Sequence, residues 1–280
     1  MSRIDIRSSI EPPEKTATAG QHEPASSGNS VAGFIAGVPA EQAGARTLAA
    51  ATYAVMIDQP RSVAAEKFWR LKTKLLNLYK DTVRVIVVTS PAPRDGKSFV
   101  ALNLALAFAA EASQTLLVDA DLRRPTVHNL LIPQPTIGLG DVLRGAVKVD
   151  QAIVRLKNTQ LRVLPGGKPV LDPVEMLSSP ACNDVFTALS QRFSRIIVDT
   201  PPIVPFADAD VLAAFADGVV MVVRAGVTPA TAYTQAVSLV TSTRVLGVVL
   251  NDVTRNLADY GHYHERYHSS YYYDREKEPK

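Results

Sequence analysis

Three short segments of this chain have the residue types that bind a nucleotide phosphate together with a metal ion. In the first, Gly96, Lys97 and Ser98 follow an apolar run at 83–88 and precede a stretch rich in alanine and leucine. A lysine at the start of a helix can reach the β- and γ-phosphates of a nucleotide, and a hydroxyl beside it can ligate Mg²⁺. Gly96 permits a tight turn, so that backbone amides at the helix N-terminus can point at phosphate oxygens. The segment predicts a P-loop, although a GKS tripeptide also begins ordinary helices.

The other two segments supply carboxylates where apolar strands are predicted to end. Asp119 and Asp121 follow the run at 115–118, and Asp199 closes the run at 196–198. Alternate residues of a strand face the same way, so Asp119 and Asp121 can converge on one site. In an open parallel sheet, ligands bind outside the carboxyl ends of the strands, where these segments finish. Any one aspartate could merely cap a loop, but three segments in this order predict one site for a nucleotide phosphate and Mg²⁺.

The elements that must position these residues alternate along the chain. The predicted strands are 83–88, 116–118, 161–164, 196–198, 219–223 and 245–250, and the predicted helices are 98–110, 182–192, 207–215 and 228–241. Strands that alternate with helices are typical of a parallel sheet covered on both faces. The sequence therefore predicts an α/β fold with a doubly wound, mostly parallel sheet.

Composition fits a soluble enzyme. The 280 residues and a hydrophobic content of 46% are enough for a sizeable core. The net charge of +3 is too small to indicate binding of nucleic acid. The single Cys182 excludes an intramolecular disulfide framework and fits a reducing cytoplasm. Residues 1–55 read as a disordered extension, and the stretch at 31–57 contains Pro39 and charged residues that exclude a membrane span.

The motifs and their flanking segments together resemble the bacterial tyrosine kinase family of capsular and exopolysaccharide biosynthesis. This family is a branch of the deviant-Walker P-loop ATPases related to Mrp and MinD. The resemblance runs from about residue 59 to the C-terminus, and the flanking segments that match are GLGDVL at 138–143, LRVLPGG at 161–167, DPVEMLSS at 172–179 and LGVVLN at 246–251. It implies a P-loop NTPase with deviant Walker motifs, a tyrosine kinase domain over residues 56–258, and ATP and Mg²⁺ as cofactors.

With this resemblance, the reaction expected is in-line transfer of the γ-phosphoryl group of ATP to a tyrosine hydroxyl. The expected catalytic residues are Lys97, Asp119 and Asp121, of which one aspartate would accept the tyrosine proton. The expected ligands of Mg²⁺ are Ser98, Asp121 and Asp199. The expected nucleotide-binding residues are Pro93, Arg94, Asp95, Gly96, Lys97, Ser98, Phe99, Arg224 and Asn251. Asn251 is a candidate for the adenine edge, but Arg224 and Asn251 could instead be loop residues with local hydrogen bonds.

Two positions of the predicted P-loop depart from the family pattern. Arg94 stands where a glycine is expected, and arginine is strained if φ must be positive there, which could lower nucleotide affinity. Alternatively, Arg94 could lend its charge to the phosphates. Ala92 occupies the position of the additional lysine of the MinD-like branch, which favours the kinase branch over the partitioning ATPases.

Residues 65–75 resemble the helix in which the family places an E-x-x-R-x-x-R oligomerisation motif. Glu66 is retained, but Trp69 and Lys72 replace the two arginines. Lysine is not equivalent to arginine at a bidentate contact. We expect a homo-oligomer, and the replacements leave open whether it is a ring. The alternative is an amphipathic helix whose apolar face packs on the domain.

Residues 259–280 are polar and lack any apolar periodicity, so a flexible tail is expected. The resemblance implies that its tyrosines become autophosphorylated, and the expected phosphoacceptors are Tyr260, Tyr263, Tyr267, Tyr271, Tyr272 and Tyr273. Each phosphate would add about −1.5 to −2 charges. The alternative is a disordered tail without a role in phosphotransfer. Three histidines of the tail could bind a transition metal weakly but are more simply explained as polar spacers.

The resemblance further implies a regulator of polysaccharide synthesis and export that acts with a transmembrane chain-length (co-polymerase) protein as its activator. The chain would then be cytoplasmic and peripherally associated with the inner face of the membrane through that partner. Two other functions stay open. One is a non-kinase ATPase switch of the MinD or ParA kind, which the tyrosines oppose. The other is a scaffold that binds nucleotide poorly because of Arg94.

Overall fold

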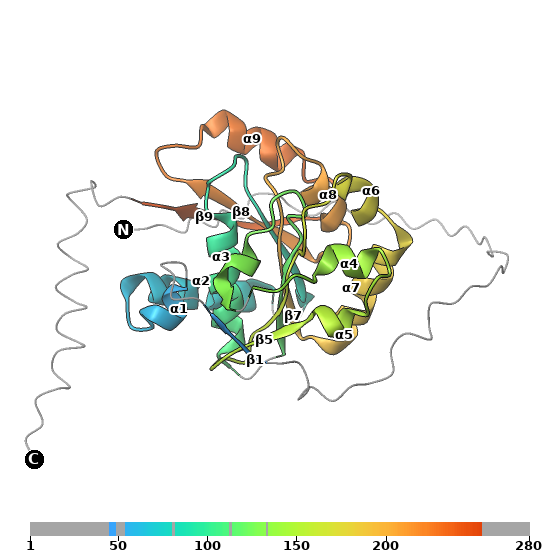
Figure 1. Cartoon of the computed structure of the whole chain (residues 1–280). Helices are drawn as coiled ribbons and strands as arrows, with labels where there is room; N and C mark the ends of the chain where they lie inside the picture. The colour runs from blue at the N-terminus through green and yellow to red at the C-terminus, as the bar shows by residue number, and fades with distance from the viewer. Residues whose placement is uncertain (1–44, 49–53, 80–81, 112–113, 133, 254–280) are drawn as a thin grey trace, which may run out of the picture.

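The computed structural model describes residues 45–48, 54–79, 82–111, 114–132 and 134–253 (Figure 1). The strands are β1 (Ala45–Leu48), β2 (Val85–Thr89), β3 (Thr115–Asp119), β4 (Leu131–Ile132), β5 (Val154–Leu156), β6 (Arg162–Leu164), β7 (Arg195–Asp199), β8 (Gly218–Arg224) and β9 (Val245–Asn251). The helices are α1 (Val55–Asp58), α2 (Val63–Tyr79), α3 (Lys97–Ala109), α4 (Leu139–Leu143), α5 (Val149–Ala152), α6 (Pro173–Leu177), α7 (Pro180–Arg192), α8 (Asp208–Ala213) and α9 (Ala230–Ser238), with a 3₁₀ turn η3 (Val127–Leu130).

Within the described residues the nine strands form one sheet in the order β4-β1-β5-β6-β3-β7-β2-β8-β9. The pairs from β6 to β9 are all parallel. Antiparallel pairing is confined to one edge, where β5 pairs with β6 and β4 pairs with β1. The structure therefore confirms the mostly parallel α/β sheet. The carboxyl ends of β2, β3 and β7, three neighbouring strands, lie at one edge of it.

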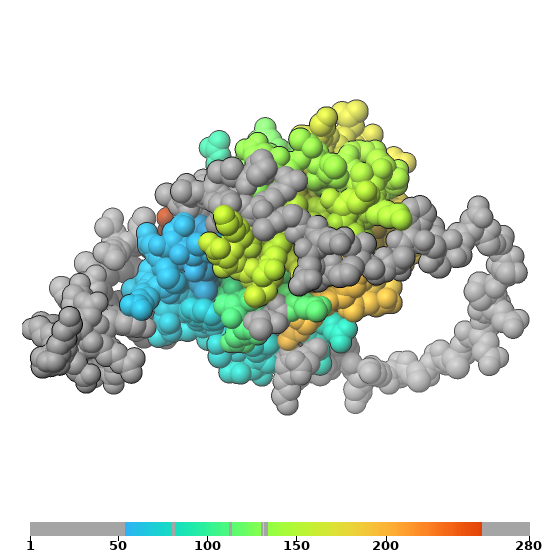
Figure 2. All heavy atoms as spheres, turned by 60° about the horizontal axis from the view of Figure 1, so that its bottom comes forward, coloured from blue at the N-terminus to red at the C-terminus, as the bar shows by residue number. Residues whose placement is uncertain are grey.

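Helices cover both faces of the sheet. In Figure 1, α1, α2 and α3 lie on one side of the strands, and α4 to α8 lie on the other. Figure 2 turns the bottom of this view toward the reader, with the blue atoms of α1 and α2 on the left and the green to yellow-green middle of the chain reaching from the centre to the upper right. Each face has its own apolar core. Because β2, VIVVT, is buried along its whole length, it reads as a continuous apolar run rather than an alternating one.

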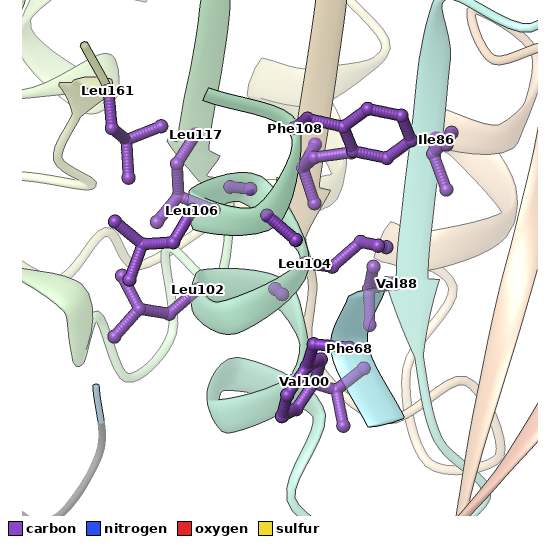
Figure 3. Close-up of a cluster of buried hydrophobic side chains, with 14 of the residues drawn as sticks. Phe68, Ile86, Val88, Val100, Leu102, Leu104, Leu106, Phe108, Leu117 and Leu161 are labelled. Atoms are coloured by element: carbon purple, nitrogen blue, oxygen red, sulfur yellow. The ribbon is translucent and has the colours of Figure 1, made fainter. Parts of the chain in front are cut away.

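Helix α3 is the element that carries the P-loop residues into this fold. All its residues from Val100 to Ala109 are buried, because the sheet covers one side and α2 covers another. Figure 3 shows Val100, Leu104 and Phe108 pointing from α3 toward the strands and Phe68 of α2 beside Val100. The Phe68 and Phe99 rings meet edge to face, with centroids 5.7 Å apart. A helix fixed on two sides gives its first residues, Lys97 and Ser98, one defined position.

Helix α2 packs on the domain through its apolar face, in agreement with the amphipathic alternative for residues 65–75. Phe68, Leu71 and Leu75 are buried. Lys72 is also buried, and its ammonium pairs with Glu111 and lies 5.1 Å from the centroid of the Trp69 ring. Lys72, which stands at the second arginine position of the oligomerisation motif, is thus used within its own domain.

The predicted strands and helices agree with the structure in position, with ends shifted by a few residues. For example, the helix predicted at 182–192 is α7, which begins at Pro180 because the Ser179 hydroxyl caps it by accepting the Cys182 N–H at 3.3 Å. The disordered extension predicted over residues 1–55 has to be shortened, because β1, which lies in that range, pairs with β4 and β5 of the domain. Residues 1–44 and the tail at 259–280 lie outside the described residues. No helix of the described part of the chain is long and apolar enough to cross a bilayer.

Candidate active site

The predicted P-loop connects β2 to α3 and has two residues in the left-handed backbone region. Arg94 has φ 68° and Gly96 has φ 97°. A Cβ atom on residue 96 would lie 2.0 Å from Nδ2 of Asn251, so only glycine fits there. The φ of 68° at Arg94 meets the condition under which the sequence predicted backbone strain at this residue. Pro93 and Arg94 are exposed at the tip of the loop, whereas Asp95 is buried.

Lys97 and Ser98, the first residues of α3, face the loop that follows β3. The Lys97 ammonium lies 3.3 Å from Oδ2 of Asp121, and the two side chains are only 14% and 7% exposed. The Ser98 hydroxyl oxygen accepts a hydrogen bond from Oγ1 of Thr126 at 3.3 Å. The structure thus brings together the expected lysine, serine and aspartate, and it adds Thr126, which sequence reasoning missed.

Asp119 is fully buried and fixed by backbone amides. Its Oδ2 accepts the N–H groups of Thr126 at 3.0 Å and Val127 at 2.9 Å, and its Oδ1 accepts the N–H of Asp121 at 3.2 Å. Burial, and then the charge of Asp199, raise the pKa of Asp119 well above its usual range, against the opposing effect of the Val127 and Thr126 amides. Asp119 therefore shapes the loop from Asp121 to Val127 and stands beside a second buried carboxylate.

Asp199 ends β7 directly across from Asp119 of β3. It is fully buried, and no hydrogen bond of normal geometry reaches either carboxylate oxygen within the described residues, although the Ser98 hydroxyl lies close enough to stabilise its charge. Burial raises its pKa to about 6, while the nearby Lys97 charge and Ser98 hydroxyl act in the opposite direction. A buried carboxylate that is stabilised only by a nearby lysine and one hydroxyl is costly in free energy. Its persistence at this place indicates a ligand that binds carboxylate oxygens.

The residues present fit a magnesium ion that is shared with a nucleotide. Mg²⁺ usually takes one or two carboxylates, keeps several waters and binds substrate phosphates. The two Asp199 oxygens and the Ser98 hydroxyl offer such a partial shell. No group of three or more His, Cys, Asp or Glu side chains in the described ranges could hold a metal ion by itself. An all-protein metal cage is therefore not expected, whereas a phosphate-bridged ion is.

A second ion pair fixes the loop after β3 to the start of α8. Arg123 donates from Nε and Nη2 to both carboxylate oxygens of Asp208 at 3.0–3.1 Å, and its guanidinium lies 4.3 Å from the centroid of the Phe206 ring. Asp208 is fully buried. The sequence gave no signal that Arg123 and Asp208 pair, because they lie 85 positions apart. This contact holds the loops that carry Asp121 and Asp199 against each other.

Asp208→Asn is expected to lower the free energy of unfolding by up to about 3–5 kcal/mol, because it leaves the Arg123 charge without its buried partner. Urea denaturation followed by circular dichroism measures the change. The matched control is Glu66→Gln, which removes the exposed pair with Arg70, whose closest atoms are 3.6 Å apart, and should cost less than about 1 kcal/mol. Equal effects of the two variants would contradict a structural role for the Arg123–Asp208 pair.

Of the two predicted nucleotide contacts outside the P-loop, Asn251 lies against the P-loop and Arg224 points to a neighbouring loop residue. Asn251 reaches the P-loop, where its Nδ2 donates to the carbonyl oxygen of Asp95 at 2.9 Å. Arg224 directs its guanidinium to Asp252, with an Nε–Oδ2 distance of 2.8 Å. Arg224 thus has the local hydrogen bonds of the alternative interpretation. Its contact with nucleotide, like that of Asn251 with adenine, stays a prediction. The six tail tyrosines lie outside the described residues.

The fold and the site together define a class of protein. The parts of a P-loop NTPase with deviant Walker motifs are all present: a P-loop between β2 and α3, an aspartate at the end of β3 with a second one two residues later, and a further aspartate at the end of β7. Their convergence at the carboxyl ends of parallel strands is the usual location of a ligand site in such a sheet.

Comparisons with known proteins narrow this class. No family model matches the sequence. The tyrosine-protein kinase YwqD of Bacillus subtilis is 32% identical over 213 residues, which cover 75% of this chain and 90% of that protein. The succinoglycan biosynthesis transport protein ExoP of Rhizobium meliloti is 33% identical over 72% of this chain but 26% of its own length. The kinase domain of Escherichia coli tyrosine kinase ETK superimposes with a TM-score of 0.68 at 27% identity, covering 72% of this chain and 80% of that domain.

The chain belongs to the bacterial tyrosine-protein kinase family. The match to YwqD is sufficient for this conclusion, because it extends over nine tenths of the length of that protein. The resemblance noted from the motifs is therefore confirmed, including the assignment to the kinase branch.

Proposed function

We propose that the protein transfers the γ-phosphoryl group of ATP to tyrosines of its own C-terminal tail. The observation that carries the proposal is the convergence of Lys97, Ser98, Asp121 and Asp199 around the start of α3. Family membership supplies the type of acceptor, a tyrosine hydroxyl. The six tyrosines at 260–273 supply an acceptor within the chain.

The proposed mechanism uses the residues as positioning and electrostatic groups. Backbone amides at Gly96 and Lys97 bind the phosphates at the N-terminus of α3, where the helix dipole favours negative charge. The Lys97 ammonium, which lies 3.3 Å from Asp121, stabilises the negative charge that develops on the transferred phosphoryl group. Ser98 and Asp199 hold Mg²⁺, which when bound neutralises and orients the phosphates. Asp121, beside Lys97, would complete the metal shell or accept the tyrosine proton, while Asp119, expected from the sequence to share these tasks, holds the loop that carries Asp121 through its bonds to backbone amides.

The proposal is tested with purified protein, Mg²⁺ and γ-labelled ATP. Label is expected in phosphotyrosine within residues 260–273, and it should disappear from a variant with all six tail tyrosines changed to phenylalanine. That variant should still bind ATP, which calorimetry can check. Released phosphate without labelled tyrosine would contradict the proposal and favour an ATPase switch, and absence of ATP binding would favour a scaffold.

We also infer that the kinase acts in surface polysaccharide synthesis at the inner face of the membrane, together with a transmembrane co-polymerase protein. The support is the relative ExoP, whose name assigns it to succinoglycan biosynthesis and transport and of which this chain matches only a part. Addition of the partner's cytoplasmic segment should increase tail phosphorylation, and no increase with any neighbouring co-polymerase would contradict the inference.

A further inference from the structure

Arg94 is the residue of the P-loop with the least favourable backbone conformation. Three non-glycine residues of the described chain have positive φ: Arg94, Asn158 and Asp252. Asparagine and aspartate visit this region comparatively readily, because their short polar side chains bond locally, whereas arginine has no such advantage. Such a residue persists only where the surroundings over-determine its conformation. The contacts of the neighbouring residue, Asp95, provide that determination.

Asp95 is 2% exposed and bonded on three sides. Its Oδ2 accepts the N–H of Ala92 at 3.0 Å, which closes the loop across Arg94. Its Oδ1 accepts the hydroxyl hydrogen of Thr228 at 2.7 Å. Its carbonyl oxygen accepts Nδ2 of Asn251 at 2.9 Å. We call Asp95, Thr228 and Asn251 the Asp95 clamp.

Thr228 and Asn251, the two partners of Asp95 outside the P-loop, are themselves held near the ends of β8 and β9. The Thr228 oxygen accepts the N–H of Arg224 at 3.1 Å, so the single hydroxyl hydrogen is left for Asp95. The N–H of Ala225 donates to the carbonyl oxygen of Asn251 at 2.9 Å, which ties the two strand ends together. The clamp therefore links the P-loop to the turn after β8 and to the last residue of β9.

The charge of Asp95 supports the same reading. A carboxylate inside a loop that binds phosphates would repel them, unless its charge is stabilised by donors from the protein. Both of its oxygens have such donors, and hydrogen bonds to a charged acceptor are roughly twice as strong as neutral ones. The sequence placed Asp95 among the nucleotide-binding residues, but both of its side-chain oxygens are bonded within the protein, which suits it to shape the loop.

We propose that the Asp95 clamp holds the P-loop of this chain in its phosphate-binding conformation and compensates for arginine at position 94. Asp95 and Thr228 are positioning residues in this proposal. The inference rests on the proposed binding of ATP at this loop. It predicts that breaking the clamp lowers ATP affinity more when residue 94 is strained than when it is not. A contact that only stabilised the fold would lower the affinity equally in both cases.

The test is a double-mutant cycle between Thr228→Val and Arg94→Gly, with the dissociation constant of Mg–ATP measured by calorimetry. Valine keeps the shape of threonine but leaves Oδ1 of Asp95 without its donor, and this should weaken ATP binding about tenfold. Thr228→Ser should restore the affinity to within about twofold. In the Arg94→Gly background, Thr228→Val should cost less than about threefold, because glycine adopts positive φ without strain.

The outcomes separate the clamp from the function on which it rests. An equal loss in both backgrounds, or no loss of affinity in Thr228→Val, would overturn the clamp while ATP binding by the unmodified chain upheld the nucleotide site. An unmodified chain that binds no Mg–ATP would overturn both. If Thr228→Val does not fold, Asp95→Asn takes its place. It keeps an acceptor for Thr228 but loses the one for Ala92, and it should show the same dependence on residue 94.

Discussion

Replacing Lys97 by methionine is expected to slow tyrosine phosphorylation about 100- to 1000-fold, because it removes a fixed positive charge from a largely dehydrated site. Lys97 begins α3, is 14% exposed, and holds its ammonium 3.3 Å from Asp121. Methionine keeps the unbranched apolar stem, so the packing of the helix start should change little. The rate of label transfer from γ-labelled ATP, measured at several ATP concentrations, separates an effect on binding from one on transfer.

The expected loss lies mostly in the transfer step, since the charge that Lys97 stabilises develops on the phosphoryl group in the transition state. The control is Lys157→Met, at an exposed turn before β6, which removes one positive charge without affecting the site. Circular dichroism should give the same spectrum for all three proteins. A Lys97→Met enzyme that keeps more than about a third of its rate would show that the P-loop lysine has no catalytic role here.

The part of the site that could be predicted from the sequence is the part encoded by local pattern. Lys97 and Ser98 follow a buried strand, and Asp119 and Asp199 end two others, so both the apolar runs and the polar residues that close them are visible in sequence. The parallel sheet then determines that the ends of these strands meet. The strand order β3-β7-β2, which local pattern does not encode, then makes these ends neighbours.

The part that could not be predicted depends on contacts between distant segments. The bond between Thr126 and Ser98 joins residues 28 positions apart, and that between Thr228 and Asp95 joins residues 133 apart. A threonine in a loop has many available partners, and its neighbours in sequence do not indicate which one it takes. The same holds for Lys72, which matches a motif position in sequence but pairs with Glu111 in the structure. Strand β1 was missed because its pairing with β4 and β5 comes from the tertiary fold.

Asp199→Asn is expected to lower the phosphorylation rate about 100-fold or more and to raise the Mg²⁺ concentration needed for half of the maximal rate. The reason is that the buried carboxylate of Asp199 has no hydrogen bond of normal geometry within the described residues, so its oxygens are available to a metal ion. Asparagine preserves the shape but offers one neutral oxygen in place of a carboxylate. A rate and a Mg²⁺ requirement close to those of the unmodified enzyme would contradict the assignment of Asp199 to the metal.

The same substitution should change how stability depends on pH in the absence of Mg²⁺ and nucleotide. The pKa of Asp199 is raised from 3.8 to about 6 in the folded state. Between these values the folded protein binds more protons than the unfolded chain, so its stability falls as the pH rises through this window and is level above it.

Asp119 also titrates in the unmodified protein, so the informative quantity is the difference in unfolding free energy between the unmodified protein and Asp199→Asn. Measured by urea unfolding from pH 4 to 7, the stability of the unmodified protein should fall relative to Asp199→Asn by up to about 3 kcal/mol. Parallel curves would mean that burial of the Asp199 carboxylate has no cost in free energy, and they would contradict the argument that this cost indicates a ligand at the site.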